Sequence, residues 1–289
     1  MTARAAVIGA PFMDHAPTTF RSLDGLRLEG TLVVPDSSPR FAPAVLVHGG
    51  GVTREEGGFF TRLATGLAEV GVPSLRFDFR AHGESEGTFS ELTLSGVAND
   101  IRAAADHVRE VTGAAVVNLI AASFGGGCTV LAAATNPGMV EKLVLLYPSL
   151  NYRWRFVEDK PFFEDDRLST DAARQLARHG LLPHSGTSFM LGRPLLNEVF
   201  HLQPQRMLDK VTVPTLIIHG TKDTFIPVEA SRRAVELFGG PAELIEIEGA
   251  QHGFAVHEDP AYADPQTQQW QADVIATVAS RLSSPHGDT

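Results

Sequence analysis

Three polar side chains in this sequence are of the types that together activate a hydroxyl group. Ser123 lies in the segment Ala-Ala-Ser-Phe-Gly, Asp223 in His-Gly-Thr-Lys-Asp and His252 in Gly-Ala-Gln-His-Gly. A serine hydroxyl is nearly inert at neutral pH and needs a base that titrates near pH 7, which histidine supplies. Each residue also has a plain structural interpretation, because serine and aspartate often only cap helices and most loop histidines face solvent. Two further histidines, His82 and His219, lie inside predicted turn and strand-end segments and are poorer candidates for a base.

A glycine-rich loop, His48-Gly49-Gly50-Gly51, follows a short apolar run. Such a loop can aim a backbone N–H at the oxygen of a reacting carbonyl, although it can equally be a plain glycine turn. No group of histidine, cysteine and acidic residues has metal-ligand spacing, and no nucleotide-binding glycine pattern follows a predicted strand, so we expect neither a metal nor a cofactor. The single cysteine, Cys128, is expected to be buried and unreactive.

The elements that must position these residues alternate between strands and helices. Apolar runs and turn residues predict strands at residues 18–22, 27–34, 44–47, 73–79, 116–121, 142–147, 215–219 and 242–247. Helical periodicity predicts helices at residues 60–70, 97–111, 228–238 and 270–282, and a further helix starts directly after Ser123. This order predicts an α/β fold with a mainly parallel β-sheet flanked by helices. The loops that follow the strands are then the expected place for chemistry, and Ser123, Asp223 and His252 all lie there.

Residues 149–210 interrupt the alternation. This segment has no clear strand and combines dense charge with large aromatic residues, which are Tyr152, Trp154, Phe156, Phe162, Phe163, Phe189 and Phe200. It is much longer than an ordinary connection, which favours a mostly helical cap inserted over the sheet rather than a pair of crossover helices. The predicted organisation is an α/β core at residues 18–148 and 211–283, a cap at 149–210 and an N-terminal extension at 1–17. We expect Phe162, Phe163 and Phe189 to line a substrate pocket, the alternative being that they form the cap's own small core.

Composition restricts the class of protein. The chain has 289 residues, of which 43% are apolar and 20% charged, as is usual for a folded globular protein. Its 24 basic and 34 acidic side chains give a net charge of −10, the wrong sign for a nucleic-acid partner. No window approaches the roughly 20 consecutive apolar residues of a membrane-spanning helix, and Gly9 and Pro11 interrupt the apolar stretch at residues 5–13, unlike a signal peptide. We therefore expect a cytoplasmic protein with no membrane partner.

The chain resembles the α/β-hydrolase superfamily from about residue 18 to residue 282. The order serine, aspartate, histidine, with each residue just after a predicted strand, is the order of the triad in that superfamily. Residues 77–85, Phe-Asp-Phe-Arg-Ala-His-Gly-Glu-Ser, are similar to the stretch F-D-x-R-G-H-G-x-S found in many members. Ala121 and Ala81 depart from it, because the family patterns have glycine at both positions. The loops are most similar to bacterial carboxylesterases of the feruloyl or cinnamoyl type and to their acyl-peptidase relatives.

This resemblance implies a mechanism. Ser123 would be the nucleophile, His252 the general base and then acid, and Asp223 the group that orients and stabilises the imidazolium. The predicted function is hydrolysis of a carboxylic ester or thioester of a small to medium acyl group, and such a small molecule is the predicted partner. Acyl transfer or lactone formation would use the same residues with an alcohol in place of water. A catalytically silent protein that binds a ligand beneath the cap is a third interpretation, which the presence of all three residues disfavours.

The resemblance also implies where the negative oxygen of the tetrahedral intermediate binds. The donors would be the backbone N–H of Phe124, which follows the nucleophile, and the backbone N–H of Gly50 in the glycine loop. Gly51 is the alternative second donor. The sequence leaves open whether two chains associate as a homodimer.

Overall fold

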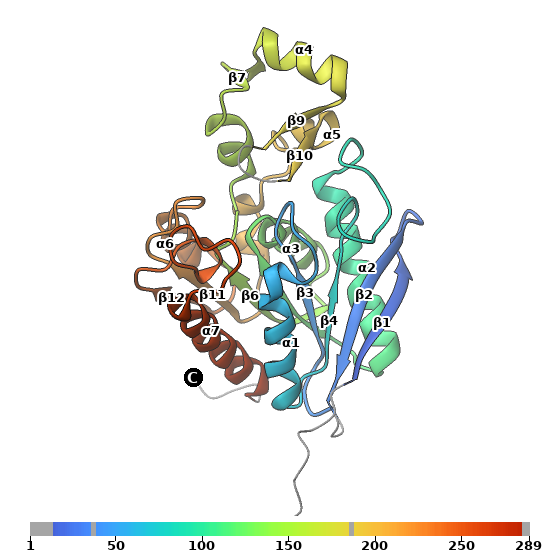
Figure 1. Ribbon diagram of the computed structural model, residues 1–289. Coiled ribbons are helices and arrows are strands. Elements are labelled where there is room, and N and C mark those ends of the chain that lie inside the picture. The colour runs from blue at the N-terminus through green and yellow to red at the C-terminus, as the bar shows by residue number, and fades with distance from the viewer. Residues whose placement is uncertain (1–13, 36–38, 185–187, 285–289) are drawn as a thin grey trace, which may run out of the picture.

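An eight-stranded sheet forms the centre of the protein, for which a computed structural model describes residues 14–35, 39–184 and 188–284 (Figure 1). Across the sheet the strands are β1 (Asp14–Arg21), β2 (Arg27–Val34), β4 (Ser74–Phe77), β3 (Ala44–Val47), β5 (Val117–Ala122), β6 (Val140–Leu146), β11 (Thr215–Gly220) and β12 (Ala242–Ile247). β2 runs antiparallel to both of its neighbours, and the strands from β4 to β12 are parallel. The predicted α/β fold with a mainly parallel sheet is confirmed.

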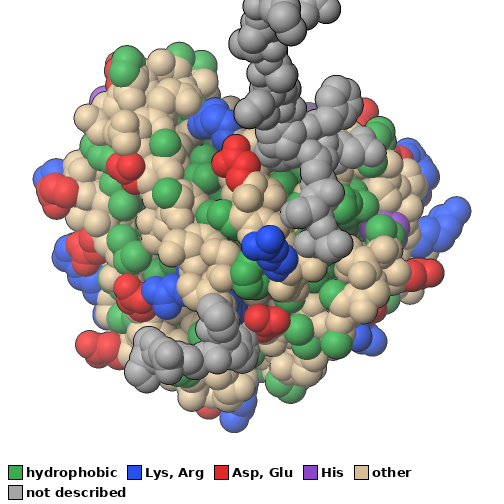
Figure 2. Space-filling view, turned by 90° about the horizontal axis from the view of Figure 1, so that it is seen from below, with side chains coloured by type: hydrophobic (Ala, Val, Ile, Leu, Met, Phe, Trp, Pro, Cys, Tyr) green, Lys and Arg blue, Asp and Glu red, His purple; other side chains and the backbone are tan. Residues whose placement is uncertain are grey.

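Helices cover both faces of the sheet (Figure 1). They are α1 (Phe59–Glu69), α2 (Leu94–Thr112), α3 (Ser123–Thr135), α6 (Glu229–Ala234) and α7 (Pro265–Ser283). Alternate residues of a strand point to opposite faces, so Leu46 of β3 packs in the core beneath α1 and α7, whereas Val45 and Val47 pack beneath α2 and α3. Both faces of the central strands are buried, which is why their sequences are continuous apolar runs. Among the described residues, no helix has the length and apolar character of a membrane span. Figure 2 shows acidic, basic and hydrophobic side chains interspersed over the face seen from below.

Most predicted elements differ from the observed ones only at their ends. The helix predicted at residues 228–238 is divided into α6 and a 3₁₀ turn at Val235–Leu237. The strand predicted at residues 73–79 ends at Phe77, because the next residue, Asp78, turns into the loop and accepts the backbone N–H of Arg54 at 2.6 Å. Local polar contacts of this kind end an element earlier than its apolar pattern does.

β1 begins before the predicted start of the core. Residues 14–17, which the sequence assigned to an N-terminal extension, form the first half of this strand and pair with residues 31–34 of β2. Pro17 has no backbone N–H to donate, but β1 is an edge strand, where a missing donor is tolerated. Residues 1–13, the rest of the predicted extension, lie outside the described residues.

The segment predicted as a cap lies above the sheet, at the top of Figure 1. Its elements are a π-helical turn (Trp154–Glu158), β7 (Phe163–Glu164), β8 (Arg167–Leu168), α4 (Thr170–His179), β9 (Leu181–Pro183), β10 (Met190–Gly192), α5 (Arg193–Glu198) and two 3₁₀ turns (Pro204–Arg206 and Leu208–Lys210). Its regular structure is mainly helical, but it also contains two short antiparallel hairpins that the sequence did not predict. Strands of two or three residues are too short to show an alternating pattern.

Candidate active site

Ser123 lies at a sharp turn between β5 and α3. Its φ of +48° is in the left-handed region that non-glycine residues rarely adopt. A Cβ atom at Gly125 would lie 2.4 Å from the carbonyl oxygen of His48, so glycine is needed where α3 passes the end of β3. Ala121, which stands where the family pattern has glycine, is fully buried in β5. The turn therefore holds the Ser123 hydroxyl at the carboxyl edge of the sheet.

The structure brings Ser123, His252 and Asp223 together in one hydrogen-bonded chain. His252 lies in a 3₁₀ turn (His252–Phe254) that follows β12, and Asp223 follows β11. His252 Nε2 is 3.0 Å from Ser123 Oγ, and His252 Nδ1 is 2.7 Å from Asp223 Oδ2. Parallel strands end at the same edge of the sheet, which is why residues 100 and 129 positions away from Ser123 reach it.

Asp223 is held as a carboxylate. Its side chain is buried, and Oδ1 accepts the backbone N–H groups of Phe225 at 2.8 Å and Ile226 at 2.9 Å. Burial opposes ionisation, but the charge of His252 and the hydrogen bonds from both neighbouring histidines outweigh it and lower the pKa of Asp223 below its usual value. A carboxylate can only accept, so Nδ1 of His252 carries a proton and Nε2 is left to accept the Ser123 hydroxyl.

The two other histidines considered from the sequence, His219 and His82, bind groups other than the Ser123 hydroxyl. His219 is fully buried, with Nδ1 2.7 Å from Ser231 Oγ and Nε2 2.9 Å from the carbonyl oxygen of Ile226. The same Nε2 lies 3.3 Å from Asp223 Oδ2, the oxygen that His252 also contacts. His82 Nε2 accepts the backbone N–H of Gly51 at 3.0 Å, and burial lowers the pKa of His82 to about 4. This ring is therefore neutral near pH 7, and the backbone N–H of Gly51 is already used in the hydrogen bond to it.

The glycine loop contributes one backbone N–H that has no acceptor among the described residues. Gly49 donates to Glu56 Oε2 at 2.8 Å and Gly51 donates to His82, which leaves Gly50. A Cβ atom at Gly50 would lie 3.3 Å from Cβ of Phe124, so these two residues are adjacent across the site. The N–H of Phe124 is in the first turn of α3, where no intrahelical acceptor exists. Of the alternatives raised by the sequence, the geometry favours Gly50 over Gly51 as partner of Phe124.

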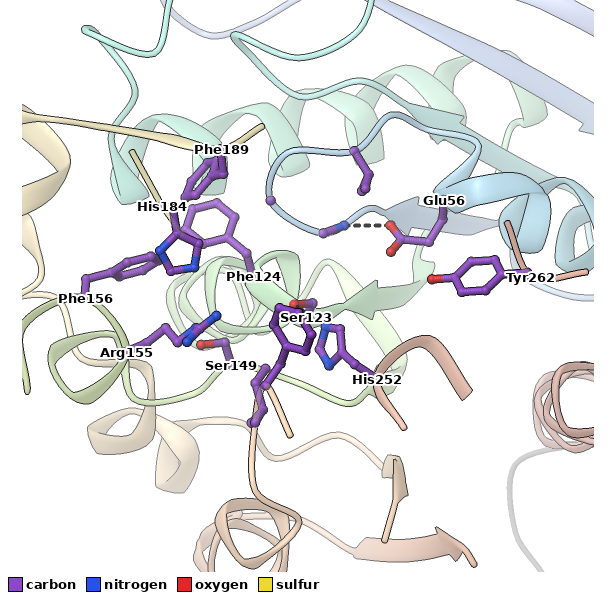
Figure 3. A pocket seen from close by; sticks show the side chains of 15 residues that line it. Glu56, Ser123, Phe124, Ser149, Arg155, Phe156, His184, Phe189, His252 and Tyr262 are labelled. Atoms are coloured by element: carbon purple, nitrogen blue, oxygen red, sulfur yellow. Dashed lines mark hydrogen bonds between the residues drawn. The ribbon is translucent and has the colours of Figure 1, made fainter. Parts of the chain in front are cut away.

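A cavity of about 180 Å³ surrounds Ser123. Figure 3 shows Glu56 and Tyr262 at one end, with the Tyr262 hydroxyl pointing toward the carboxyl group, and Arg155, Phe156, His184 and Phe189 at the cap end. The remaining lining residues are Gly49, Gly50, Val52, Phe124, Ser149, Phe225, Ile226 and His252. The cavity is thus apolar over much of its wall, with one acidic and one basic end.

The three aromatic residues expected to line the pocket occupy different places. Phe189 lines the cavity and lies against Gly50 and Gly51. Phe162 and Phe163 are absent from the cavity lining in the described ranges and pack against the core, and the ring of Phe163 is 5.9 Å from that of Phe200. For these two residues the expectation is corrected: Phe163 lies in β7, where its ring packs beside Phe200, and Phe162 packs against the core. Nothing in their sequence context separates them from Phe189.

Sequence reasoning missed Glu56 and Arg155, although both line the cavity. Glu56 begins a 3₁₀ turn (Glu56–Gly58), is 6% exposed, and burial raises its pKa to about 7. The only signal was an acidic residue inside a glycine-rich loop, a composition that solvated loops share. Within the described ranges no cluster of histidine, cysteine and acidic residues could hold a metal ion.

The mainly parallel sheet, with helices on both faces and Ser123 at a sharp turn after β5, has the architecture of the α/β-hydrolase class, and comparisons with known proteins agree. The model of the serine aminopeptidase, S33, family matches residues 39–259, and the chain belongs to this family of hydrolases.

Two relatives illustrate the similarity in sequence. The chain is 28% identical over 250 residues to the monoacylglycerol lipase of Mycolicibacterium smegmatis (strain ATCC 700084 / mc(2)155), a match that covers 75% of this chain and 82% of that protein. It is 26% identical over 241 residues to the monoglyceride lipase of Homo sapiens, covering 74% and 77% of the two chains. Among solved structures, Est1E from Butyrivibrio proteoclasticus with bound ferulic acid superposes with a TM-score of 0.71 at 23% identity, covering 91% of this chain and 100% of that one. The structural match shows the shared fold.

Proposed function

We propose that this hydrolase cleaves a carboxylic ester or thioester through an acyl-enzyme on Ser123. The observation that carries the proposal is the continuous chain from Ser123 Oγ through His252 to the buried carboxylate of Asp223, with distances of 3.0 and 2.7 Å. Relatives named as lipases support an ester substrate, as does the likeness to a structure that holds ferulic acid.

In the first half of the reaction, Ser123 Oγ attacks the carbonyl carbon while His252 Nε2 takes its proton. The positive imidazolium is stabilised by Asp223, and the negative oxygen is bound by the N–H groups of Gly50 and Phe124. His252 then donates its proton to the leaving oxygen or sulfur, and the acyl group remains on Ser123.

In the second half, water attacks the acyl-enzyme with His252 again as base. The acid product leaves, and the proton returns to Ser123 Oγ. To reach Ser123, the substrate must fit in the cavity between the Glu56 end and the cap end.

The test is activity-based labelling combined with ester hydrolysis. Wild-type protein should react with a fluorophosphonate probe and hydrolyse p-nitrophenyl butyrate and butyryl-CoA. Ser123→Ala should abolish labelling and lower kcat by roughly four to six orders of magnitude without unfolding the chain. Ser149→Ala is the matched control, because this serine lines the same cavity but is not the serine that contacts His252, and it should leave labelling intact. Undiminished turnover in Ser123→Ala would refute the mechanism.

A further inference from the structure

Arg155 gives the cap end of the cavity a positive charge that the reaction above does not use. It lies in the π-helical turn Trp154–Glu158, and its side chain is 11% exposed. Figure 3 shows it extending from the cap into the cavity, toward the side on which Ser123 and His252 lie. A group of the substrate that lies at the cap end would therefore meet this guanidinium.

The carboxylates near Arg155 do not fully neutralise the positive charge at the cap end of the cavity. Arg155 Nη1 donates to Asp159 Oδ2 at 2.9 Å, but Lys160 Nζ lies 3.0 Å from the same oxygen. The charge of Asp223 also acts on Arg155, yet that carboxylate already binds His252 and two backbone N–H groups. Two cations therefore share one carboxylate at the cap end.

Two other ionisable groups of the cavity, His184 and Glu56, do not remove this excess of positive charge at the cap end. Burial, together with the charges of Arg155 and Lys160, lowers the pKa of His184 to about 3, so its ring adds no charge near pH 7. Glu56 lies at the opposite end of the cavity, where it accepts the N–H of Gly49 (Figure 3). An anion beside Arg155 would thus be attracted by a cation that shares its carboxylate partner, Asp159, with Lys160.

Arg155 also keeps hydrogen-bond donors available. Among the described residues, only Asp159 accepts a hydrogen bond from it, through Nη1, which leaves Nε and Nη2 without acceptors. Its Cζ lies 5.9 Å from the centre of the Phe225 ring, and Phe156 and Phe189 add apolar walls. A charge in such surroundings is poorly solvated, and a guanidinium can donate two parallel hydrogen bonds to a carboxylate.

We propose that Arg155 binds a carboxylate of the substrate, so that the preferred substrates are esters or thioesters carrying a second, ionised carboxyl group. This inference rests on the proposed function and names its substrate class. A monoester of a dicarboxylic acid carries the group on the acyl side, and an ester of a hydroxy acid carries it on the alcohol side. Arg155 recognises the same chemistry in both.

Two pairs of esters distinguish a carboxylate on the acyl side of the substrate from one on the alcohol side. On the acyl side, p-nitrophenyl hydrogen adipate is compared with p-nitrophenyl hexanoate, which has the same acyl length without the charge. On the alcohol side, 4-(butyryloxy)benzoate is compared with 4-carbamoylphenyl butyrate. The measured quantity is the ratio of kcat/KM for the charged ester to that for its neutral partner, after subtraction of the enzyme-free rate. We expect wild-type protein to prefer the charged ester roughly 10- to 100-fold in one of the pairs.

Variants at Arg155 test whether this residue causes the preference. Arg155→Met keeps the apolar stem without the charge and should bring the ratio close to one, whereas Arg155→Lys should retain part of the preference. Arg153→Met is the matched control, because Arg153 pairs with Glu158 and Asp166 and is not among the residues that line the cavity in the described ranges. Its ratio should equal that of wild type.

The outcomes are distinguishable. Equal kcat/KM for charged and neutral esters in both pairs would overturn the proposal from wild-type data alone, even if Arg155→Met does not fold. An unchanged ratio in a folded Arg155→Met would overturn it as well. Absence of fluorophosphonate labelling at Ser123 would instead refute the proposed function, whereas normal labelling without a carboxylate preference would refute only this inference.

Discussion

The carboxyl group of Glu56 should make the stability of the protein depend on pH. Its side chain is 6% exposed at the wall of the cavity, and burial raises its pKa from the ordinary 4.5 to about 7, against the opposing effect of the Gly49 hydrogen bond. The folded protein therefore keeps this proton between pH 4.5 and 7, whereas the unfolded chain releases it. The resulting stabilisation is fully present below pH 4.5 and is lost as the pH rises through 7.

The size of the effect follows from the two pKa values. A difference of 7 − 4.5 = 2.5 units corresponds to about 3 kcal/mol at roughly 1.36 kcal/mol per unit. Part of this is already lost at pH 5, so about 2.5 kcal/mol should disappear between pH 5 and pH 8. Glu56→Gln keeps an oxygen that can accept the Gly49 N–H but cannot ionise, so its stability should lack this component.

Urea unfolding at pH 5, 6.5 and 8 measures the effect in both proteins. Other groups titrate in the same range, so the informative quantity is the difference in free energy of unfolding between wild type and Glu56→Gln at each pH. That difference should move by about 2 to 3 kcal/mol in favour of the variant as the pH rises. Glu55→Gln removes the neighbouring carboxylate, which is 40% exposed, and serves as the control. A difference for Glu56→Gln that changes no more with pH than that of Glu55→Gln would refute the reasoning.

Three further predictions follow from single contacts. Phe189→Ala should shift the preferred acyl or alcohol length in a series of esters, because Phe189 lines the cavity, whereas Phe163→Ala should only lower Tm; identical changes in the two variants would contradict this assignment. Ala81 has a φ of +65°, so Ala81→Gly should raise the free energy of unfolding in urea by about 0.5 to 1 kcal/mol, and a loss of stability would show that the alanine is not strained. Burial raises the pKa of Cys128 to about 12, so native protein should not react with a thiol reagent until denaturant is added, and rapid labelling without denaturant would count against a buried thiol.

Some features of the fold were visible in the sequence because their causes are local. The strands β3, β5 and β11 are buried on both faces, and this burial requires the continuous apolar runs from which they were predicted. Features without a local cause were missed. The cap hairpins are held by backbone pairing over two or three residues, and β1 extends back to Asp14 because it pairs with β2.

The sequence by itself determined that Ser123, Asp223 and His252 follow strands of a parallel sheet, because strand burial and chain order are written in local patterns and parallel strands share one carboxyl edge. Only the tertiary structure decided which neighbours complete the cavity. Among the described residues, Gly50 rather than Gly51 has an N–H without an acceptor, because His82, 31 residues away from Gly51, accepts the N–H of Gly51. Phe189, and neither Phe162 nor Phe163, lines the cavity in the described ranges, and Arg155 enters it from the cap. Such choices depend on atoms from distant segments meeting within a few ångströms, a distance that no periodicity or motif encodes.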